Sequence, residues 1–411
     1  MLTLENILAA KYRFGEVVKN TPLEYSERLS KKYQAEIYLK REDLQKVRSY
    51  KIRGAYNLIS SLSKEEQKKG VVCASAGNHA QGFALSCSEL GISGVVYMPV
   101  TTPEQKVYKT KQFGGKYIEV KLIGDTFDQA LKAAKEYEAK NGSTFVHPFD
   151  DERTIVGQAT LGLEIFEGLP EVDMIVAPIG GGGVISGVIT TRNILEKNTE
   201  IIGVEPEGAA SMKRSLELRE NTTLEKIETF VDGAAVARVG EMPFRLCRDN
   251  NIEVITAPEN RICSTILEFL REDGIVLEPA GALESDGLKT LGERLKGKKV
   301  VVIVSGGNLD FERLPEIKER SLRYEGKKRY YLVKFPQRPG ALKSFLEFLG
   351  PDDDIARFEY MKKSNRNTAP VLIGIEALGK DNFLTIEHNM QENGFSFENI
   401  TDNDMYFNLL V

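Results

Sequence analysis

The stretch "MIVAPIGGGGVISGVITTRNIL", residues 174–195, joins two kinds of sequence through four consecutive glycines. Its first six residues form a short apolar run typical of a buried strand, and the residues after the glycines are typical of a buried helix. Glycines at such a junction let backbone N–H groups converge on an anion at the helix N-terminus. The stretch therefore predicts a strand, a phosphate-binding loop at Gly180 to Gly183, and a helix.

The glycine loop does not match the nucleotide-binding motifs. A P-loop needs Gly-Lys-Ser/Thr, which is absent, and the GxGxxG pattern fails because Val184, Ile185 or Ser186 falls where a glycine is required. A nucleotide is therefore disfavoured as the source of the phosphate. A glycine-rich turn without any ligand remains an alternative when the loop is considered alone.

Outward from this stretch, strand-like and helical segments alternate from about residue 35 to 308. Alternation with compact apolar runs favours parallel sheets covered on both faces, the α/β class. The expected strands are residues 35–40, 71–75, 93–100, 115–120, 143–148, 174–179, 199–206, 251–256 and 298–305.

The end of the chain has a different order of elements. After a charged helical segment and a linker, the order is strand, helix, strand, strand, helix, strand, which is the ferredoxin-like βαββαβ order. The segments are residues 329–335, 339–349, 355–363, 369–378, 382–394 and 405–411. We place the domain boundary near residue 325, so that the domains are 1–325 and 326–411.

The composition favours a soluble protein that acts on small molecules. Lys+Arg 55 against Asp+Glu 60 gives a net charge of −5, so there is no basic excess that would attract nucleic acid or an anionic membrane. No segment is long and apolar enough to span a bilayer, and no signal peptide is recognisable, so a cytoplasmic location is expected. The scattered cysteines are typical of reduced core thiols, and the three distant histidines do not predict a zinc site.

A lysine occupies an unfavourable position in "RSYKIRGAYNLI", residues 48–59. With Ser49 as N-cap, a helix starts at Tyr50, and one packed face of it carries Lys51, Ala55, Leu58 and Leu62. The helix dipole and burial both disfavour an ammonium group there, so both favour a neutral amine, which a general base requires. Taken alone, Lys51 could also be a snorkelling surface lysine.

Two further strand ends carry polar groups. The strand of residues 71–75 runs into the turn Ala76-Gly77-Asn78 and a helix from about His79, and Ser305 ends the strand of residues 298–305. Ligands of α/β proteins bind at the carboxyl ends of the strands. We therefore expect one site with an anion cradle, a carboxylate cradle, polar side chains and an amine.

With these residues assembled, the chain resembles the pyridoxal-phosphate (PLP) enzymes of the tryptophan synthase β-like fold, and within them the threonine dehydratase family. Seven segments match in family order over roughly residues 15 to 320: "KREDLQKVRSYKIRGAYN", "CASAGNHAQG", "PIGGGGVISG", "GVEPEGAASM", "VDGAAVARVG", "EPAGAL" and "VSGGN". The resemblance implies two subdomains in the catalytic part, of which the smaller spans roughly residues 45–145. The end module is similar to a single ACT-like regulatory domain.

The family's roles transfer to matching positions. The resemblance implies that Lys51 binds PLP covalently and then acts as the base at the substrate Cα, while Tyr50 packs near the ring. Asn78 would bind the ring hydroxyl, and Ser305 the pyridine nitrogen. The phosphate would be held by Gly180, Gly181, Gly182, Gly183 and Val184. The substrate carboxylate would be held by backbone donors of Ser75, Ala76, Gly77, Asn78 and His79.

The resemblance also implies the reaction and its control. L-threonine, with L-serine as a secondary substrate, would be dehydrated and deaminated to a 2-keto acid and ammonia in isoleucine biosynthesis. A hydroxyl at Ser305 makes the cofactor a weaker electron sink, which favours loss of the β-hydroxyl over transamination. The cofactor phosphate is the expected proton donor to the leaving hydroxide. Isoleucine, or valine, would act through residues 326–411, and the expected assembly is a homotetramer.

Several alternatives stay open. Related serine racemases have a serine at the position of Ala76, which disfavours racemisation here, and their divalent-cation site would draw on Glu205, Ala209 and Ser211, the last being acidic in those enzymes, so no metal is expected. A serine-preferring dehydratase or a cysteine synthase remains within the fold. An amino-acid sensor with a decayed catalytic domain is disfavoured by the intact Lys51, Asn78 and Ser305.

Overall fold

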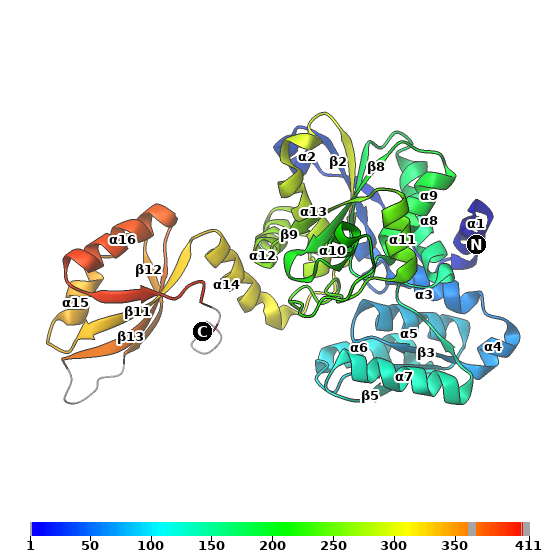
Figure 1. Ribbon diagram of the computed structural model, residues 1–411, viewed down its shortest axis with the longest axis horizontal. Helices are drawn as coiled ribbons and strands as arrows, with labels where there is room; N and C mark the ends of the chain where they lie inside the picture. The colour runs from blue at the N-terminus through cyan, green and yellow to red at the C-terminus, as the bar shows by residue number, and fades with distance from the viewer. Residues whose placement is uncertain (1, 361–366, 404, 406–411) are drawn as a thin grey trace. The chain divides into compact units, whose positions relative to one another are not determined.

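The computed structural model describes residues 2–360, 367–403 and 405. The chain divides into two compact units, Met1–Asp310 and Phe311–Val411 (Figure 1). Each unit has its own hydrophobic core.

The larger sheet of the first unit has six strands in the order β1-β2-β10-β7-β8-β9. All neighbours are parallel except β1, an antiparallel edge strand that pairs Leu23 with Lys40. The strands are β1 (Leu23–Tyr25), β2 (Glu36–Arg41), β7 (Met174–Pro178), β8 (Glu200–Pro206), β9 (Glu253–Ala257) and β10 (Lys299–Val304). The three-residue β1 was not predicted, because so short a run carries no alternation of apolar and polar residues.

Helices cover both faces of this sheet (Figure 1). On one face α8, α9 and α11 share a core with β7, β8 and β10, and on the other α13 packs against β7 to β10. The helices around this sheet are α1 (Leu4–Phe14), α2 (Glu27–Tyr33), α8 (Glu152–Gly168), α9 (Gly183–Ile194), α10 (Ser211–Leu218), α11 (Glu241–Asp249), α12 (Glu259–Glu268) and α13 (Pro279–Leu291). Short 3-10 or π turns lie at η1 (Glu42–Leu44), η3 (Glu207–Ala209), η4 (Phe269–Asp273) and η5 (Gly292–Leu295).

The smaller sheet of the first unit is parallel throughout, in the order β5-β4-β3-β6. Its strands are β3 (Val71–Ala74), β4 (Gly94–Met98), β5 (Ile118–Leu122) and β6 (Thr144–Phe145). Helices α3 and α5 pack on one face and α7 on the other. The helices are α3 (Lys51–Ser60), α4 (Lys64–Lys69), α5 (Asn78–Leu90), α6 (Glu104–Gly114) and α7 (Phe127–Asn141), with a 3-10 turn η2 (Gly115–Tyr117).

The α/β prediction is confirmed. Each of the nine expected strands coincides with one of β2 to β10 in the sheets described above, although the expected strand at 143–148 is reduced to two residues. All four cysteines are buried and free, as expected of core thiols.

The second unit has the expected βαββαβ order, preceded by a helix. Its antiparallel sheet has the order β12-β13-β11-β14. The elements are η6 (Phe311–Arg313), α14 (Leu314–Tyr324), β11 (Lys328–Pro336), α15 (Ala341–Leu346), β12 (Asp354–Tyr360), β13 (Thr368–Glu376), α16 (Lys380–Glu392) and β14 (Ser396–Asn399).

The second unit contains one strand that the sequence did not predict. It is β14, the last strand of the described residues, which follows the turn at Gly394 and pairs with β11 through Leu332 and Glu398. The segment 405–411, where the strand was expected, lies outside the described residues except for Met405. "SFEN" has few β-branched residues, so its pairing with β11 is decided by tertiary contacts.

The helix α14 is grouped with the second unit. Lys328, at the start of β11, forms ion pairs with Glu319 of α14 at 2.7 Å and with Glu376 of β13 at 3.1 Å. These contacts join the helix to the sheet, so the structural division falls before α14, whereas the sequence boundary was placed after it.

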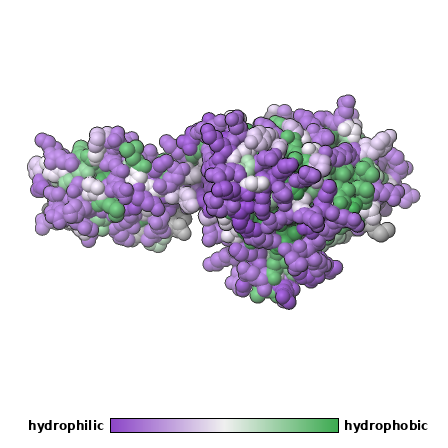
Figure 2. All heavy atoms as spheres, turned by 90° about the horizontal axis from the view of Figure 1, so that it is seen from above, coloured by the Kyte–Doolittle hydropathy of each residue, from purple (hydrophilic) through white to green (hydrophobic). Residues whose placement is uncertain are grey.

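Hydrophilic side chains predominate on the face of the molecule shown in Figure 2. Within the described residues, no helix combines the length and the apolar character that crossing a membrane requires.

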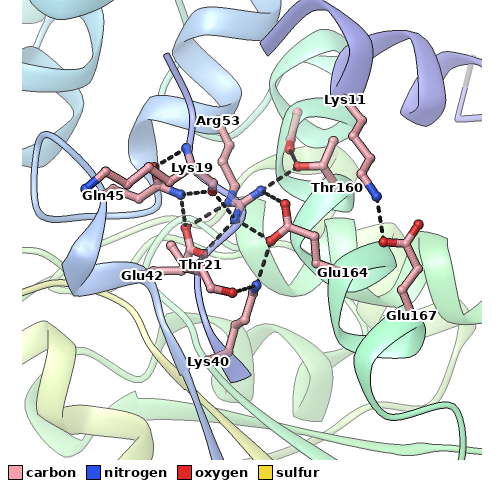
Figure 3. Close-up of polar contacts among 11 residues, drawn as sticks. Lys11, Lys19, Thr21, Lys40, Glu42, Gln45, Arg53, Thr160, Glu164 and Glu167 are labelled. Atoms are coloured by element: carbon pink, nitrogen blue, oxygen red, sulfur yellow. Dashed lines mark hydrogen bonds and ion pairs between the residues drawn. The ribbon is translucent and has the colours of Figure 1, made fainter. Parts of the chain in front are cut away.

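A buried cluster of four charges fixes the start of α3 (Figure 3). Arg53 is fully buried and donates to both carboxylate oxygens of Glu42, with Nε and Nη2 each 2.8 Å away. It donates equally to Glu164 of α8, with Nη1 and Nη2 each at 2.8 Å. Lys40 of β2 donates to Glu164 at 2.6 Å and to the Thr21 carbonyl at 2.6 Å. Two cations and two anions therefore share one interior site.

The charges of this cluster stabilise each other. Burial alone raises the pKa of Glu42, but Arg53 lowers it below the ordinary value of a glutamate. Burial likewise lowers the pKa of Arg53, while Glu42 and Glu164 raise it. Bidentate geometry of this kind compensates for lost hydration only when both partners are present. The cluster ties β2, α3 and α8 together within two residues of Lys51.

We expect Arg53→Met to lower the free energy of unfolding by about 3–5 kcal/mol, because it leaves two carboxylates buried without their main cation. Urea unfolding of the purified protein measures this. The matched control is Lys11→Met, which removes the pair of Lys11 with Glu167 at 2.6 Å, also drawn in Figure 3. That pair is exposed, so its loss should cost less than about 1 kcal/mol. Equal losses of unfolding free energy in the two variants would show that the buried cluster is no more important for stability than the exposed pair.

Candidate active site

Lys51 is the first residue of α3, and its amine is close to two groups from distant parts of the chain. Its Nζ donates to the carbonyl of Pro148 at 3.3 Å. Burial lowers the pKa of Lys51 to about 8, an effect that the Glu278 carboxyl partly offsets. The expected tendency toward a neutral amine is therefore present in the structure, with burial as its cause.

The expected N-cap at Ser49 is wrong. Tyr50 occupies the N-cap position without a side-chain cap, and the Ser49 hydroxyl is buried with no hydrogen-bond partner among the described residues. Ser49 forms a β-bridge with Gly306, which directs its backbone toward the end of β10. The apolar positions Ala55, Leu58 and Leu62 are buried as expected. The opposite side of α3 is buried too, because α8 and α5 both pack against it.

Ser305 follows β10 and lies next to the Lys51 segment. Its carbonyl accepts the Tyr50 N–H at 3.2 Å, and its hydroxyl donates to the Ala280 carbonyl at 3.0 Å. Tyr50 itself is partly buried against the larger core, with the Lys51 amine 5.2 Å from the ring centroid. The structure thus brings together three of the predicted site residues.

Asn78 is held at the start of α5 by two side chains. Its Nδ2 donates to Glu278 Oε1 at 2.5 Å, and its Oδ1 accepts from Asn308 Nδ2 at 2.7 Å. These two contacts fix the orientation of the Asn78 amide, with Nδ2 toward Glu278 and Oδ1 toward Asn308. Burial raises the pKa of Glu278 to about 7, and Asp232 contributes in the same direction.

The turn before α5 leaves backbone donors accessible. Residues 75–78 are partly exposed, and α5 begins at Asn78, so its first N–H groups have no acceptor within the helix. The Ser75 hydroxyl accepts the Gly77 N–H at 3.2 Å. A Cβ added at Gly77 would meet no atom within 4 Å, and the residue does not have positive φ. Neither close packing nor a left-handed backbone conformation therefore requires a glycine at position 77.

The glycine loop is packed tightly from one side. Gly182 has φ of +90°, in the left-handed region, and α9 begins at Gly183. A Cβ on Gly181 would lie 2.1 Å from the ring of Phe149, the residue after Pro148. Because Pro148 contacts the Lys51 amine, residues 148–149 connect the amine to the loop. Val184, the second residue of α9, is buried.

His79 and His147 are both neutral and engaged. His79 Nε2 bonds the Val146 carbonyl at 2.8 Å, and burial lowers the pKa of His79 to about 3. Burial lowers the pKa of His147 to about 4, and its Nδ1 accepts the Asp150 N–H at 2.8 Å. Neither imidazole is a proton donor near neutral pH.

Several residues of this site were not assigned from the sequence. Glu278, Asn308, Pro148 and Phe149 all contact predicted site residues. Glu278 and Asn308 lie in the quoted segments "EPAGAL" and "VSGGN", and a glutamate within an apolar segment was a usable signal. No pattern in the sequence indicated that residues 148–149 contact the Lys51 amine and the glycine loop.

Glu205 accepts hydrogen bonds from the backbone at the start of α10. Its carboxylate accepts the N–H groups of Met212 and Lys213 at 2.7 and 2.8 Å, at the start of α10. Burial raises the pKa of Glu205 to about 7. In the described part of the chain no three His, Cys, Asp or Glu residues are grouped so that they could hold a metal ion.

Comparison with known proteins identifies the family. A family model described as pyridoxal-phosphate dependent enzyme matches residues 15–306. The chain belongs to the pyridoxal-phosphate dependent enzyme family. A second model, the C-terminal regulatory domain of threonine dehydratase, matches residues 319–410. The expected cofactor class and the regulatory domain are thereby confirmed.

Relatives similar over their full length share one name. A biosynthetic L-threonine dehydratase of Halalkalibacterium halodurans is 49% identical, covering 100% of this chain and 99% of that protein. Another from Bacillus subtilis is 46% identical, covering 100% and 98%.

Solved structures share the fold of the first unit. A threonine deaminase of Solanum lycopersicum is 41% identical with a TM-score of 0.73, covering 77% of this chain and 92% of that chain. A maize serine racemase is 30% identical with a TM-score of 0.71, covering 78% and 98%. The tryptophan synthase β-like fold class expected from the sequence is confirmed.

The residues of this family member fit pyridoxal phosphate. The cofactor needs an amine for its aldehyde, donors for its phosphate, and polar groups for its ring. Lys51 supplies an amine of lowered pKa, and the loop before α9 supplies a helix N-terminus approached by glycines. Asn78 and Ser305 are polar side chains near the Lys51 segment, held in place by the contacts described above.

If the turn binds the substrate carboxylate, as the sequence predicts, an added methyl group would obstruct it, and we expect Gly77→Ala to raise the KM for the amino-acid substrate about tenfold or more. The thermal midpoint should not change, since the added Cβ meets no atom within 4 Å. The matched control is Gly379→Ala in the second unit, where a Cβ also meets nothing within 4 Å. An unchanged KM in Gly77→Ala would contradict backbone binding of the carboxylate.

Proposed function

We propose that this enzyme uses pyridoxal phosphate bound to Lys51 to convert L-threonine to 2-oxobutyrate and ammonia, the first committed step of isoleucine biosynthesis. The observation that carries the proposal is the Lys51 amine, which donates to the Pro148 carbonyl and has its pKa lowered to about 8 by burial, while the neighbouring Tyr50 N–H bonds the Ser305 carbonyl. The names of full-length relatives at 46–49% identity support the substrate. L-serine is the secondary substrate.

The cofactor contacts follow from the same positions. Tyr50 would pack near the ring, Asn78 would hydrogen-bond the ring hydroxyl, and Ser305 would bind the pyridine nitrogen. The phosphate would be held by backbone donors of Gly180, Gly181, Gly182, Gly183 and Val184. The substrate carboxylate would be held by backbone donors of Ser75, Ala76, Gly77, Asn78 and His79.

In the reaction, Lys51 moves a proton. Pyridoxal phosphate, when bound, supplies an electron sink for the bonds at the substrate Cα. Lys51 in its neutral form takes the Cα proton, and the lowered pKa keeps a useful fraction of the amine neutral near pH 7 to 8. The Pro148 carbonyl orients Nζ by accepting its hydrogen bond at 3.3 Å.

The surrounding side chains limit the reaction to elimination. Burial lowers the pKa of His79 to about 3 and that of His147 to about 4, so both are weaker bases than Lys51 and neither competes with it for the Cα proton. Ala76, at the position where the racemases have a serine, provides no acid or base for the opposite face of Cα. Both features favour a dehydratase over a racemase, although a racemase shares the fold.

The regulatory part of the proposal concerns the second unit. We assign residues 1–325 to catalysis, with a smaller subdomain at roughly 45–145, and residues 326–411 to binding of isoleucine, with valine as a second effector. The match to a threonine dehydratase regulatory domain supports this assignment. The proposed assembly is a homotetramer in the cytoplasm, as the family resemblance implies.

We expect Lys51→Ala to be colourless and to release no 2-oxobutyrate from L-threonine, because it lacks both the covalent attachment and the base. Absorbance of the purified protein and a ketoacid assay measure these outcomes. Lys46→Ala is the matched control, since Lys46 is exposed and pairs with Glu89 at 3.7 Å. Full turnover in Lys51→Ala would refute the assignment of Lys51.

We expect isoleucine to change the rate of 2-oxobutyrate release by the full chain, because a second amino-acid site couples to the first. The rate is measured with threonine and with serine, each with and without isoleucine and valine. A chain ending at residue 325 is compared under the same conditions. An isoleucine response that survives this truncation would place the effector site elsewhere.

A further inference from the structure

A buried carboxyl contacts the backbone of Ser305. Glu284 of α13 is fully buried, and its Oε1 accepts the Ser305 N–H at 2.8 Å. Its Oε2 has no hydrogen-bond partner among the described residues. The groups that act on this carboxyl are Ser305, its own backbone and Glu278, and none of these is a cation.

Glu284 differs in this respect from the fully buried carboxyls Glu42 and Asp286. Glu42 bonds Arg53 through both oxygens, and Asp286, two residues further along α13, pairs with Arg261 at 2.7 Å. A buried carboxylate without a cation is costly, and the group takes up a proton instead. Burial accordingly raises the pKa of Glu284 well above that of an ordinary glutamate, and Glu278 adds to the effect.

The titratable groups facing Glu284 do not reverse this conclusion. The phenol of Tyr50, at the start of α3, and the carboxyl of Glu278, just before α13, both interact with it unfavourably when ionised. The cations of the neighbouring helices, Arg261 of α12 and Lys289 of α13, lie with Asp286. These surroundings therefore favour the protonated, uncharged form of Glu284.

Ser305 is held from three sides by this arrangement. Its N–H bonds Glu284, its hydroxyl donates to the Ala280 carbonyl, and its carbonyl accepts from Tyr50. Glu284 and Ala280 are one helical turn apart on α13, so a single helix holds both the backbone and the hydroxyl of Ser305.

We infer that Glu284 is a positioning residue that acts as an uncharged carboxylic acid to hold Ser305 against the cofactor's pyridine nitrogen. The inference rests on the proposed function for the role of Ser305. An ionised carboxylate behind Ser305 would favour a protonated pyridine nitrogen and so a stronger electron sink. An uncharged acid fixes the serine without that effect, which favours elimination over transamination.

The first test measures the charge of Glu284 in the apoprotein. The stability of the wild type is compared with that of Glu284→Gln by urea unfolding from about pH 5 to about pH 9. If the folded pKa is raised, the unfolded chain loses the proton first, so the wild type should lose stability relative to the variant as pH rises above about 4.3. A difference that does not depend on pH would overturn the inference.

The second test measures the coupling of Glu284 to the cofactor. Apoprotein is titrated with pyridoxal phosphate, and Glu284→Ala should raise the dissociation constant about tenfold, because Ser305 loses its N–H acceptor. Glu284→Gln, which keeps an acceptor oxygen, should raise it less. In the double variant that combines Glu284→Ala with Ser305→Ala, the dissociation constant for pyridoxal phosphate should rise no more than in Ser305→Ala alone.

The control is Asp286→Asn, a buried carboxyl of the same helix that does not bond Ser305. Its dissociation constant for pyridoxal phosphate should equal that of the wild type. If Glu284→Ala behaves like this control, or if its effect adds fully to that of Ser305→Ala, the positioning role is refuted. Ketoacid release by the wild type is assayed in parallel, so failure of the proposed function is recognised separately.

Discussion

The bidentate pairing of Arg53 with Glu42 and Glu164 is the constraint on which the position of α3 depends. The helix has no side-chain N-cap, carries two cationic residues in its first turn and contains a glycine, so its own sequence favours it weakly. Buried charges are stable only in one arrangement of their partners, which come from η1, β2 and α8. The cluster therefore specifies where Lys51 lies as much as it stabilises the fold.

Lys51 and Arg53 show how one buried helix lowers the pKa of one cation and raises the pKa of another. Arg53 bonds two carboxylates, so it remains a guanidinium despite complete burial. Lys51 donates to a carbonyl, and the Glu278 carboxyl raises its pKa too little to offset burial. Two residues apart, the same loss of hydration thus produces a structural charge in one case and a reactive amine in the other.

The sequence predicted the features that depend on local patterns. In the first unit, the nine expected strands, the glycine loop and the turn at Asn78 follow from periodicity and from glycine and asparagine placement, and all are present. The Ser49 cap failed because the β-bridge to Gly306, 257 residues away, directs that segment. Glu278 and Asn308 lie in segments that match the family, but the sequence did not predict a role for either. Their contacts to Asn78 span 200 and 230 residues, and contacts at such separations produce no periodic pattern in a single sequence.

The buried carboxyls of the first unit divide by whether a cation accompanies them. Glu42, Glu164 and Asp286 have cationic partners and belong to the scaffold. Glu278 and Glu284, which contact Asn78 and Ser305, form no ion pair among the described residues, and burial raises the pKa of both. In the proposed site, groups that carry little negative charge would hold the cofactor ring. Such surroundings would make the bound cofactor a weaker electron sink, which favours loss of the β-hydroxyl over transfer of the amino group.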